Sequence, residues 1–341
     1  MDNPALQGQS TPVIASIAFC NFKALRSTRI ALTPFNLVIG PNGSGKTSLL
    51  EAVGRLGGLA RMSADTIPEV DPSVGMPEID FAFSEPYSDI SVRLSCVSDL
   101  TCNSLAVRPV NSAGWPALRA ELGSIRSYVL DHEAIGGGAG SDDGGKLHAN
   151  GANLAAVLAR LKERSPQSYS ELTAEVLRIM PEFRSLELAE HADGRVSFGL
   201  RLSENGFVPA VELSQGMLYL LAILALAFDP DPPRVICIEE VDRGIHPRAL
   251  REVRDALYRL SFPRAHGLDR RAVQVVTTTH SPYFIDLFNE HPEDVIISQK
   301  RGRAAHFERL SDRPDLPDLL REGSLGDMWF SGILGGVPPE R

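Results

Sequence analysis

The sequence predicts an α/β protein with a parallel core sheet, and two observations carry this prediction. An apolar segment at Phe35–Ile39 runs into a glycine-rich loop and then into a helical pattern at Ser48–Leu56. Two further apolar segments, Val235–Ile238 and Val273–Thr277, lie on either side of a helical segment, Pro247–Leu260. Strands that alternate with helices in this way are typical of parallel sheets, because parallel strands need long crossover connections.

The other segments predict an antiparallel region and a helical region around that core. Short apolar segments at Val13–Ala18 and Ile30–Leu32, with loose alternation over Asp80–Val97, predict antiparallel strands. The composition of Gly136–Gly145 predicts a flexible loop. The later predicted elements are helices at Leu154–Leu161 and Leu172–Met180, a strand pair at Ser185–Leu188 and Val196–Leu202, an apolar helix at Gln215–Phe228 and a hairpin at Val295–Leu310.

Composition and charge restrict the classes of protein to which the chain can belong. Its 341 residues are 43% hydrophobic and 23% charged, which is the balance of an ordinary soluble globular protein. The net charge of −9 argues against a general nucleic-acid coat, although a local basic face is compatible with it. The apolar run Met217–Phe228 is shorter than the ~20 residues that span a bilayer. Because the first residues also lack a signal-peptide pattern, we expect a cytoplasmic protein with no membrane partner.

The four cysteines give no sign of metal or disulfide chemistry. Cys20, Cys96, Cys102 and Cys237 include no CxxC pair and show no zinc-ligand spacing. We therefore expect neither a zinc site nor a disulfide framework.

The glycine-rich loop is the strongest functional signal in the sequence. Its N–H groups can wrap a phosphate, and the helix that follows directs its positive end at the same place. Lys46 adds a positive charge for the β- and γ-phosphates, and the Thr47 hydroxyl can bind Mg²⁺. A chance match to the whole GxxxxGKT pattern between a strand and a helix is the weaker alternative. The predicted nucleotide-binding residues here are Gly40, Pro41, Asn42, Gly43, Ser44, Gly45, Lys46, Thr47 and Ser48.

Two neighbouring glutamates follow the strand at Val235–Ile238. Consecutive residues of an extended segment point to opposite sides, so Glu239 and Glu240 can have different tasks. We predict that Glu239 binds, through a water molecule, the Mg²⁺ that Thr47 contacts, and that Glu240 polarises an attacking water. The alternative is a pair of solvated acids at the end of a strand.

A histidine, His280, follows the other late strand in the segment Thr279–Pro282. In open α/β sheets ligands bind outside the carboxyl ends of the strands, where a histidine can hydrogen-bond a γ-phosphate. A lone histidine is more often structural or solvated, so the prediction depends on its order along the chain. Lys46, Glu240 and His280 form the predicted catalytic set.

The start of the apolar helix, at Ser214, is another candidate anion site. Ser214 can cap that helix, and its first N–H groups face outward. The motif is weak alone, because many helices begin with serine, but it lies between the phosphate loop and the glutamate pair. Ser214 and Gly216 therefore mark a candidate anion site at the start of this helix.

This combination of motifs resembles the ATP-binding-cassette (ABC) ATPase superfamily, in its RecF/SMC/OLD-like branch. Within that branch the sequence is similar to compact bacterial AAA-like ATPases of the OLD group. The matching segments are Phe22-Lys23 with Leu32–Thr47 (N-terminal hairpin and Walker A), Leu213–Met217 (signature), Glu239-Glu240 (Walker B), Val241–Pro247 (D-loop), Thr279–Pro282 (switch histidine) and the tail Leu325–Val337.

The resemblance implies the fold of an ABC-ATPase head, a P-loop NTPase in which a mixed core sheet is flanked by an antiparallel β lobe and a helical signature lobe. It implies one head over residues 12–310, with a Walker A lobe at 12–135, a signature lobe at 136–228, a Walker B and switch-histidine part at 229–310, and a tail at 311–341 packed on the head. It also implies ATP and Mg²⁺ as cofactors and a homodimer in which the signature residues of one copy, Ser214, Gln215 and Gly216, contact ATP on the other. Asp242 or His246 would lie at the seam between the copies.

Four departures from the family pattern affect this interpretation. Glu239 stands where most cassettes have Asp, and Val241 replaces a common proline. Gln215 stands where many relatives carry Gly or Asp. Since no glutamine occurs between Gln9 and Gln167, the usual Q-loop ligand is missing or replaced, and hydrolysis is expected to be slow.

The resemblance and the chain length lead to one function and two rivals. Only short, interrupted helices separate Walker A from the signature, which excludes long coiled-coil arms, and the residues after His280 leave no room for a Toprim nuclease domain. We therefore expect an ATP-gated dimeric switch in phage defence or DNA maintenance that works with a separately encoded nuclease or toxin. Basic clusters at Arg264–Arg271 and Lys300–Arg303 make DNA a possible partner, although solvated loop charges are the simpler explanation. The rivals are a DNA-clamping repair ATPase and an ATP-binding assembly scaffold with little turnover.

Overall fold

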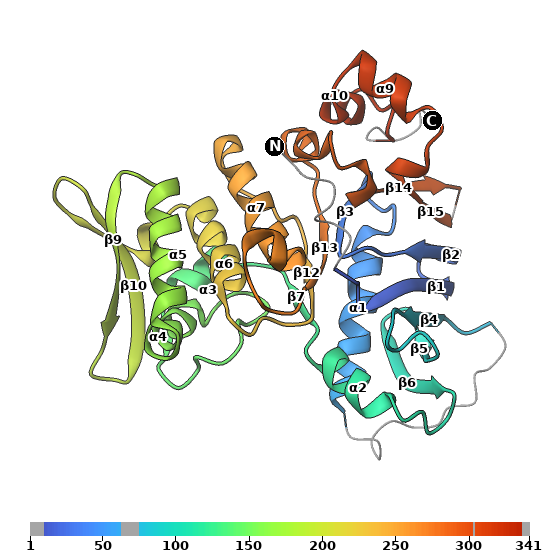
Figure 1. Cartoon of the computed structure of the whole chain (residues 1–341), viewed down its shortest axis with the longest axis horizontal. Coiled ribbons are helices and arrows are strands. Elements are labelled where there is room, and N and C mark those ends of the chain that lie inside the picture. The colour runs from blue at the N-terminus through green and yellow to red at the C-terminus, as the bar shows by residue number, and fades with distance from the viewer. Residues whose placement is uncertain (1–9, 63–74, 303, 336–341) are drawn as a thin grey trace. The chain divides into compact units, whose positions relative to one another are not determined.

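The computed structural model describes residues 10–62, 75–302 and 304–335, which form two compact units (Figure 1). The first unit contains the chain up to Ser127 together with residues 233–240 and the part from Ser261 onward. The second unit contains residues 128–232 and 241–260. The predicted division into one head over residues 12–310 and a tail over residues 311–341 stays a prediction.

A six-stranded sheet forms the core of the first unit, and its middle is parallel as expected. β3 pairs in parallel with β13 on one side and β14 on the other, and β13 pairs in parallel with β12. These four strands therefore present their carboxyl ends at the same edge of the sheet. In spatial order the strands are β15 (Ala304–Arg309), β14 (Val295–Arg301), β3 (Phe35–Ile39), β13 (Gln274–Thr278), β12 (Val235–Ile238) and β7 (Arg126–Tyr128).

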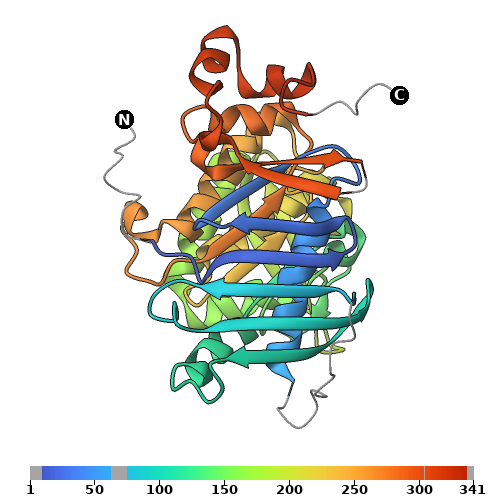
Figure 2. The same cartoon turned by 90° about the vertical axis from the view of Figure 1, so that its right-hand side faces the viewer.

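A second, antiparallel sheet confirms the strand predictions for the N-terminal part of the chain. Figure 2 shows its five strands side by side. The region predicted only as loose alternation, Asp80–Val97, supplies two of these strands. In order the strands are β2 (Leu25–Ala31), β1 (Ile14–Phe22), β4 (Glu78–Phe83), β5 (Ser91–Ser98) and β6 (Thr101–Arg108).

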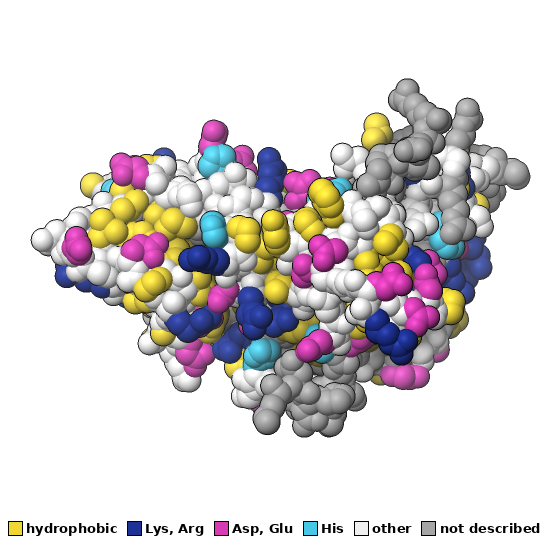
Figure 3. Space-filling model, turned by 90° about the horizontal axis from the view of Figure 1, so that it is seen from above, with side chains coloured by type: hydrophobic (Ala, Val, Ile, Leu, Met, Phe, Trp, Pro, Cys, Tyr) yellow, Lys and Arg dark blue, Asp and Glu magenta, His cyan; other side chains and the backbone are white. Residues whose placement is uncertain are grey.

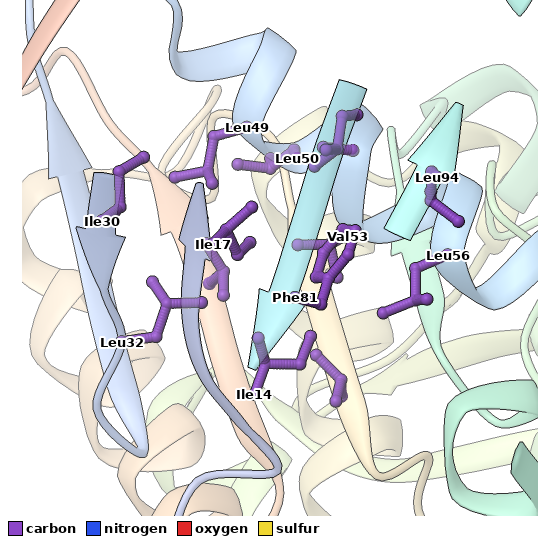
Figure 4. Close-up of a cluster of buried hydrophobic side chains, with 14 of the residues drawn as sticks. Ile14, Ile17, Ile30, Leu32, Leu49, Leu50, Val53, Leu56, Phe81 and Leu94 are labelled. Carbon is purple, nitrogen blue, oxygen red and sulfur yellow. The ribbon is translucent and has the colours of Figure 1, made fainter. Parts of the chain in front are cut away.

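Helix α1 (Lys46–Arg61) packs between these sheets because its apolar residues recur at helical spacing. Leu49, Val53 and Leu56 lie on one face and are fully buried. They contact the inward side chains of the antiparallel sheet, such as Ile17 and Phe81 (Figure 4). Burial of each such side chain contributes about 1.5–3 kcal/mol, so this face holds the start of α1 firmly against the core.

The remaining helices of the first unit lie beside the core. α2 (Trp115–Gly123) contacts α1, and the short α8 (Pro282–Ile285) follows His280. α9 (Leu316–Glu322) and α10 (Leu325–Phe330) form the C-terminal part, where Asp286 Oδ1 accepts a 2.6 Å hydrogen bond from the Gly326 N–H. The tail is thereby tied to the segment that carries the predicted switch histidine.

The second unit is built around α6 (Gln215–Phe228), which is apolar on all sides and buried along most of its length. α3 (His132–Gly136), α4 (Leu154–Arg164) and α5 (Pro166–Ile179) contact it. An antiparallel sheet of β9 (Phe183–Glu190), β10 (Arg195–Leu202), β11 (Phe207–Pro209) and β8 (Ala139–Gly140) and the helix α7 (Leu250–Ser261) complete the unit.

Two sequence predictions are wrong in detail. The segment Gly136–Gly145 is not only loop, because Ala139 and Gly140 form β8 and pair with the start of β10. A disulfide joins Cys96 and Cys102, contrary to the expectation from cysteine spacing. The two cysteines lie opposite each other on β5 and β6, a proximity that depends on strand register and leaves no motif in the sequence.

In the part of the chain that the structure describes, no helix has the length and apolar character required to cross a membrane.

Candidate nucleotide-binding site

The phosphate loop connects the end of β3 to α1, and its glycines are required by the backbone. Gly43 and Gly45 have φ of 73° and 99°, in the left-handed region that favours glycine. A Cβ on Gly40 would collide with the backbone oxygen of Ser298 on β14. The Ser298 hydroxyl also donates a 2.6 Å hydrogen bond to the Ser44 carbonyl oxygen. Ser298 therefore fixes the loop, a role that sequence reasoning missed.

Lys46 is 7% exposed and lies beneath this loop. Its ammonium donates hydrogen bonds to the carbonyl oxygens of Gly40 at 2.7 Å and Pro41 at 3.0 Å. Burial lowers the pKa of Lys46 to about 8, an effect that the charges of Glu240 and Glu239 partly oppose. The ammonium is thus held in place by two carbonyl oxygens at the edge of the cavity, where it can meet an incoming polyanion.

Thr47 and Glu239 meet at the edge where β12 ends. The Thr47 hydroxyl donates a 2.5 Å hydrogen bond to Glu239 Oε1, although the two residues lie 192 positions apart in the sequence. Hydroxyl and carboxylate oxygens are the ligands that Mg²⁺ prefers, so these two oxygens fit the predicted metal position.

Glu240 has an unusual backbone conformation for a residue with a side chain. Its φ is 47°, and its N–H donates a 2.9 Å hydrogen bond to Thr278 Oγ1 on β13. The hydroxyl of the preceding residue, Thr277, donates to the Ile238 carbonyl oxygen at 2.9 Å. Non-glycine residues in the left-handed region cluster at functional sites, where the surrounding structure holds them in place.

One cavity of about 310 Å³ brings most of the predicted site residues together. Three of its walls come from the loop and α1, from the end of β12, and from the end of β13, where His280 is exposed. Its fourth wall is the turn between β1 and β2, with Lys23 and Ala24, which sequence reasoning had not assigned to the site. The other lining residues are Asn42, Gly43, Gly45, Lys46, Thr47, Ser48, Glu239, Glu240 and Thr278.

Three loop residues do not line the cavity but shape its floor. Gly40 and Pro41 supply the carbonyl oxygens that hold Lys46. Ser44 is fully buried, and among the described residues its hydroxyl oxygen has no hydrogen-bond partner. A buried polar atom of this kind calls for a ligand or a water molecule.

The predicted signature residues lie in the second unit, at the start of α6. Ser214 is exposed, and its Oγ accepts a 3.4 Å hydrogen bond from the Met217 N–H. Gly216 packs so closely on the Gly244 carbonyl oxygen that no Cβ would fit, and Gly244 itself has φ of 70°. The helix start is therefore braced by the segment that the sequence predicts to be the D-loop.

A comparison with protein-family models identifies the group to which the chain is related. Residues 35–286, well over half of the chain, match the family described as "AAA domain, putative AbiEii toxin, Type IV TA system". The chain belongs to this family. A search of curated protein sequences gives no significant match.

Three solved structures with a similar fold are heads of SMC proteins. An Smc head from Pyrococcus furiosus, with an extended coiled coil and bound to the C-terminal domain of ScpA, is 13% identical at a TM-score of 0.55, over 91% of this chain and 100% of that one. An SmcHead bound to the C-winged helix domain of ScpA is 13% identical at 0.56, over 87% and 97%. The SMC head from Thermotoga maritima is 14% identical at 0.51, over 87% and 98%. These likenesses and the family match confirm the predicted fold of an ABC/SMC-type P-loop ATPase.

Among the described residues, the basic cluster at Arg264–Arg271 of this AAA-family chain is interspersed with acidic side chains. Arg271 donates a 3.0 Å hydrogen bond to Glu121, and the cavity of about 550 Å³ that contains Arg264 and Arg271 is also lined by Glu85, Glu121 and Asp269. On the face that Figure 3 shows, Lys and Arg are interspersed with Asp and Glu. The second cluster includes Arg303, which lies outside the described residues.

Proposed function

We propose that the chain binds ATP and hydrolyses it with Mg²⁺. The observation that carries this proposal is the single cavity at the carboxyl ends of β3, β12 and β13, into which the phosphate loop, Glu239, Glu240 and His280 converge. A site of about 310 Å³ is within the size range of small-molecule pockets.

Each residue has a separate task in this proposal. The N–H groups at the start of α1 and the Lys46 ammonium bind the β- and γ-phosphates. Thr47 and Glu239 would hold Mg²⁺, which when bound neutralises charge that develops on the phosphates. Glu240 accepts a hydrogen bond from the attacking water and orients it, and His280 contacts the γ-phosphate as a sensor.

We further propose that two copies pair head to head on ATP. Ser214, Gln215 and Gly216 are placed at a helix start on the second unit, and Ser214 is exposed to a partner. Its hydroxyl oxygen accepts from Met217, which leaves its O–H free to donate to a γ-phosphate on the other copy. Hydrolysis would remove that contact and open the dimer.

The family and fold relatives support a switch that acts through another protein. The family description names a toxin of a type IV toxin–antitoxin system, and two of the similar SMC heads are bound to ScpA. We propose a cytoplasmic role in phage defence or DNA maintenance, with a separately encoded nuclease or toxin as the effector.

One observation favours a second candidate, an ATP-binding scaffold that hardly turns over. None of the described residues that line the cavity is a glutamine, so the usual Q-loop ligand has no counterpart of the same type there. A site that binds Mg²⁺ and water with one ligand fewer would bind ATP well and hydrolyse it slowly.

A comparison of two glutamate-to-glutamine variants tests both candidates. Glu240→Gln should lower the ATPase kcat roughly 100-fold, because general-base catalysis is lost, and should keep ATP affinity. Glu163→Gln, an exposed residue of α4, is the matched control and should behave as wild type. Steady-state phosphate release and sedimentation velocity with ATP would be measured together.

The outcomes separate the candidates. A dimer that forms on ATP and persists in Glu240→Gln supports the switch. Equal, near-background turnover in wild type and Glu240→Gln, with ATP-dependent dimers in both, favours the scaffold. Failure of the wild type to bind ATP by calorimetry contradicts both.

A further inference from the structure

The backbone is strained at the end of β1 and in the turn that follows it, and this turn borders the nucleotide cavity. Asn21 and Lys23 have φ of 54° and 51°, so two residues with side chains adopt the left-handed conformation within three positions. Such residues are uncommon and persist where neighbouring contacts impose the geometry. Lys23 and Ala24 form one wall of the cavity. Contacts from neighbouring elements must therefore hold this segment in its left-handed conformation.

The contacts that hold Lys23 come from two other elements. Its backbone N–H donates a 3.0 Å hydrogen bond to Asp99 Oδ1, in the tip of the β5–β6 hairpin. Its ammonium forms a 2.5 Å ion pair with Glu51 Oε2 on α1. Both ends of the residue are therefore held, the backbone by the hairpin and the side chain by the helix.

Arg55 connects the same two elements behind the turn. One of its guanidinium nitrogens lies 3.4 Å from Glu51 Oε2 and 3.1 Å from the Asp99 carbonyl oxygen. Its guanidinium carbon lies 5.0 Å from the centre of the buried Phe22 ring, within the range of a cation–π contact. The hairpin tip, the turn and α1 thus form one connected polar network along the cavity wall.

We propose that Asp99 is a positioning residue for the nucleotide, which it serves by holding Lys23 in the conformation that presents the ammonium to the phosphates. An ammonium has three N–H donors, and Glu51 takes one of them, so Lys23 can bind an anionic ligand while it keeps its ion pair. This inference rests on the proposed ATP binding. It assigns to the tip of the β5–β6 hairpin an indirect part in nucleotide affinity, which it exerts through Lys23.

The surroundings of Asp99 allow this role to be separated from a role in folding. Asp99 is exposed, and its neighbour in the tip, Leu100, is 78% exposed. Substitutions at exposed positions away from packed features usually change stability little. Because Asp99→Ala removes one exposed hydrogen bond, to the Lys23 N–H, the chain should stay folded, and an effect on ATP binding would be local.

Calorimetric titration of the full-length protein with ATP, combined with steady-state kinetics, tests the proposal. Asp99→Ala should raise the Kd and the KM for ATP roughly three- to tenfold, the equivalent of one hydrogen bond, and leave kcat within about twofold. Asp99→Asn retains an oxygen acceptor and should restore most of the affinity. Leu100→Ala, at the same tip, is the control and should match the wild type.

A double-mutant cycle shows whether Asp99 acts through Lys23. Lys23→Met removes the ammonium but keeps the backbone N–H, so Asp99→Ala should have little further effect on Kd in that background. Additive effects of the two substitutions would overturn the proposal, as would an unchanged Kd for Asp99→Ala or equal losses in Asp99→Ala and Leu100→Ala. If the wild type binds ATP and Lys46→Ala does not, any of these results refutes only the role of Asp99 and leaves the proposed function standing. If the wild type does not bind ATP, the proposed function itself is refuted.

Discussion

Two helices of this protein begin at predicted anion sites, but they begin differently. α1 starts after Gly45, which has φ of 99° and provides no side-chain cap. α6 starts after Ser214, whose Oγ accepts a hydrogen bond from the Met217 N–H. The first helix therefore leaves its N–H groups for a ligand, whereas the second satisfies one of its own. Under the proposed function, α1 would bind phosphate through its backbone N–H groups, whereas α6 would do so through the Ser214 O–H.

The two sites also differ in how they are assembled. The α1 site gathers residues from distant segments of the chain, such as Thr47 and Glu239, which are joined by a 2.5 Å hydrogen bond. The α6 site consists of neighbouring residues braced by Gly244. The first arrangement surrounds a cavity, whereas the second lies at a helix start whose first residue, Ser214, is exposed.

The largest expected effect is at the loop before α1. Gly40→Ala would place a methyl group against the Ser298 carbonyl oxygen and displace the loop, so ATP affinity should fall by roughly 100-fold or more. Gly58→Ala is the matched control, because Gly58 lies within α1 with open space around its Cα and should gain about 0.5–1 kcal/mol of stability. Calorimetry with ATP and thermal unfolding would measure both. Normal ATP affinity in Gly40→Ala would contradict the backbone role assigned to this loop.

The second prediction separates the two functions of Ser214. Ser214→Ala removes both the cap and the O–H, so it should lower stability by about 1 kcal/mol and lower kcat roughly ten- to 100-fold. Ser214→Asp keeps an N-cap acceptor, so stability should recover, but its negative charge should prevent ATP-dependent dimerisation. Neither variant should alter the Kd for ATP of the monomer. A dimer that still forms in Ser214→Asp, by sedimentation velocity, would argue that α6 does not meet phosphate.

The third prediction uses pH to distinguish the sites. Burial lowers the pKa of Lys46 to about 8, so its ammonium is mostly present at pH 7 and mostly lost at pH 9. Since ATP binds to the protein in which Lys46 is charged, the Kd for ATP should rise roughly tenfold from pH 7 to pH 9.

Two controls accompany the pH series. Lys46→Arg keeps its charge throughout and should give a flat, although weaker, affinity profile. The start of α6 carries no titrating side chain in Ser214 to Met217, so dimerisation at saturating ATP should not follow the same curve. A flat profile in the wild type, measured by calorimetry, would exclude Lys46 as the titrating group.

The site residues at the ends of the core strands could be predicted from local sequence patterns. The other site residues could not, because they reach the site through contacts between distant segments of the chain. The phosphate loop and the glutamate pair each lie within a few residues of an apolar strand, so pattern and chemistry coincide there. Ser298, Thr278 and Lys23 reach the site only because their elements become neighbours in space. The left-handed turn around Lys23 contains no glycine that could have marked it in the sequence.

The smallest predicted effect concerns the Glu240 N–H, which is bound by a threonine hydroxyl as the Met217 N–H is bound by the Ser214 hydroxyl. Thr278 Oγ1 accepts from the Glu240 N–H at 2.9 Å, where Glu240 has φ of 47°. Thr278→Val removes the acceptor but keeps the shape, so Glu240 should lose its orientation and kcat should fall roughly three- to tenfold with KM almost unchanged. Thr278→Ser keeps the hydroxyl and should retain most of kcat. If Thr278→Val and Thr278→Ser lower kcat equally, the buried methyl group of Thr278, and not its oxygen, positions Glu240. If only Thr278→Val lowers kcat, the Thr278 hydroxyl positions Glu240 through its N–H, as the Ser214 hydroxyl caps the start of α6.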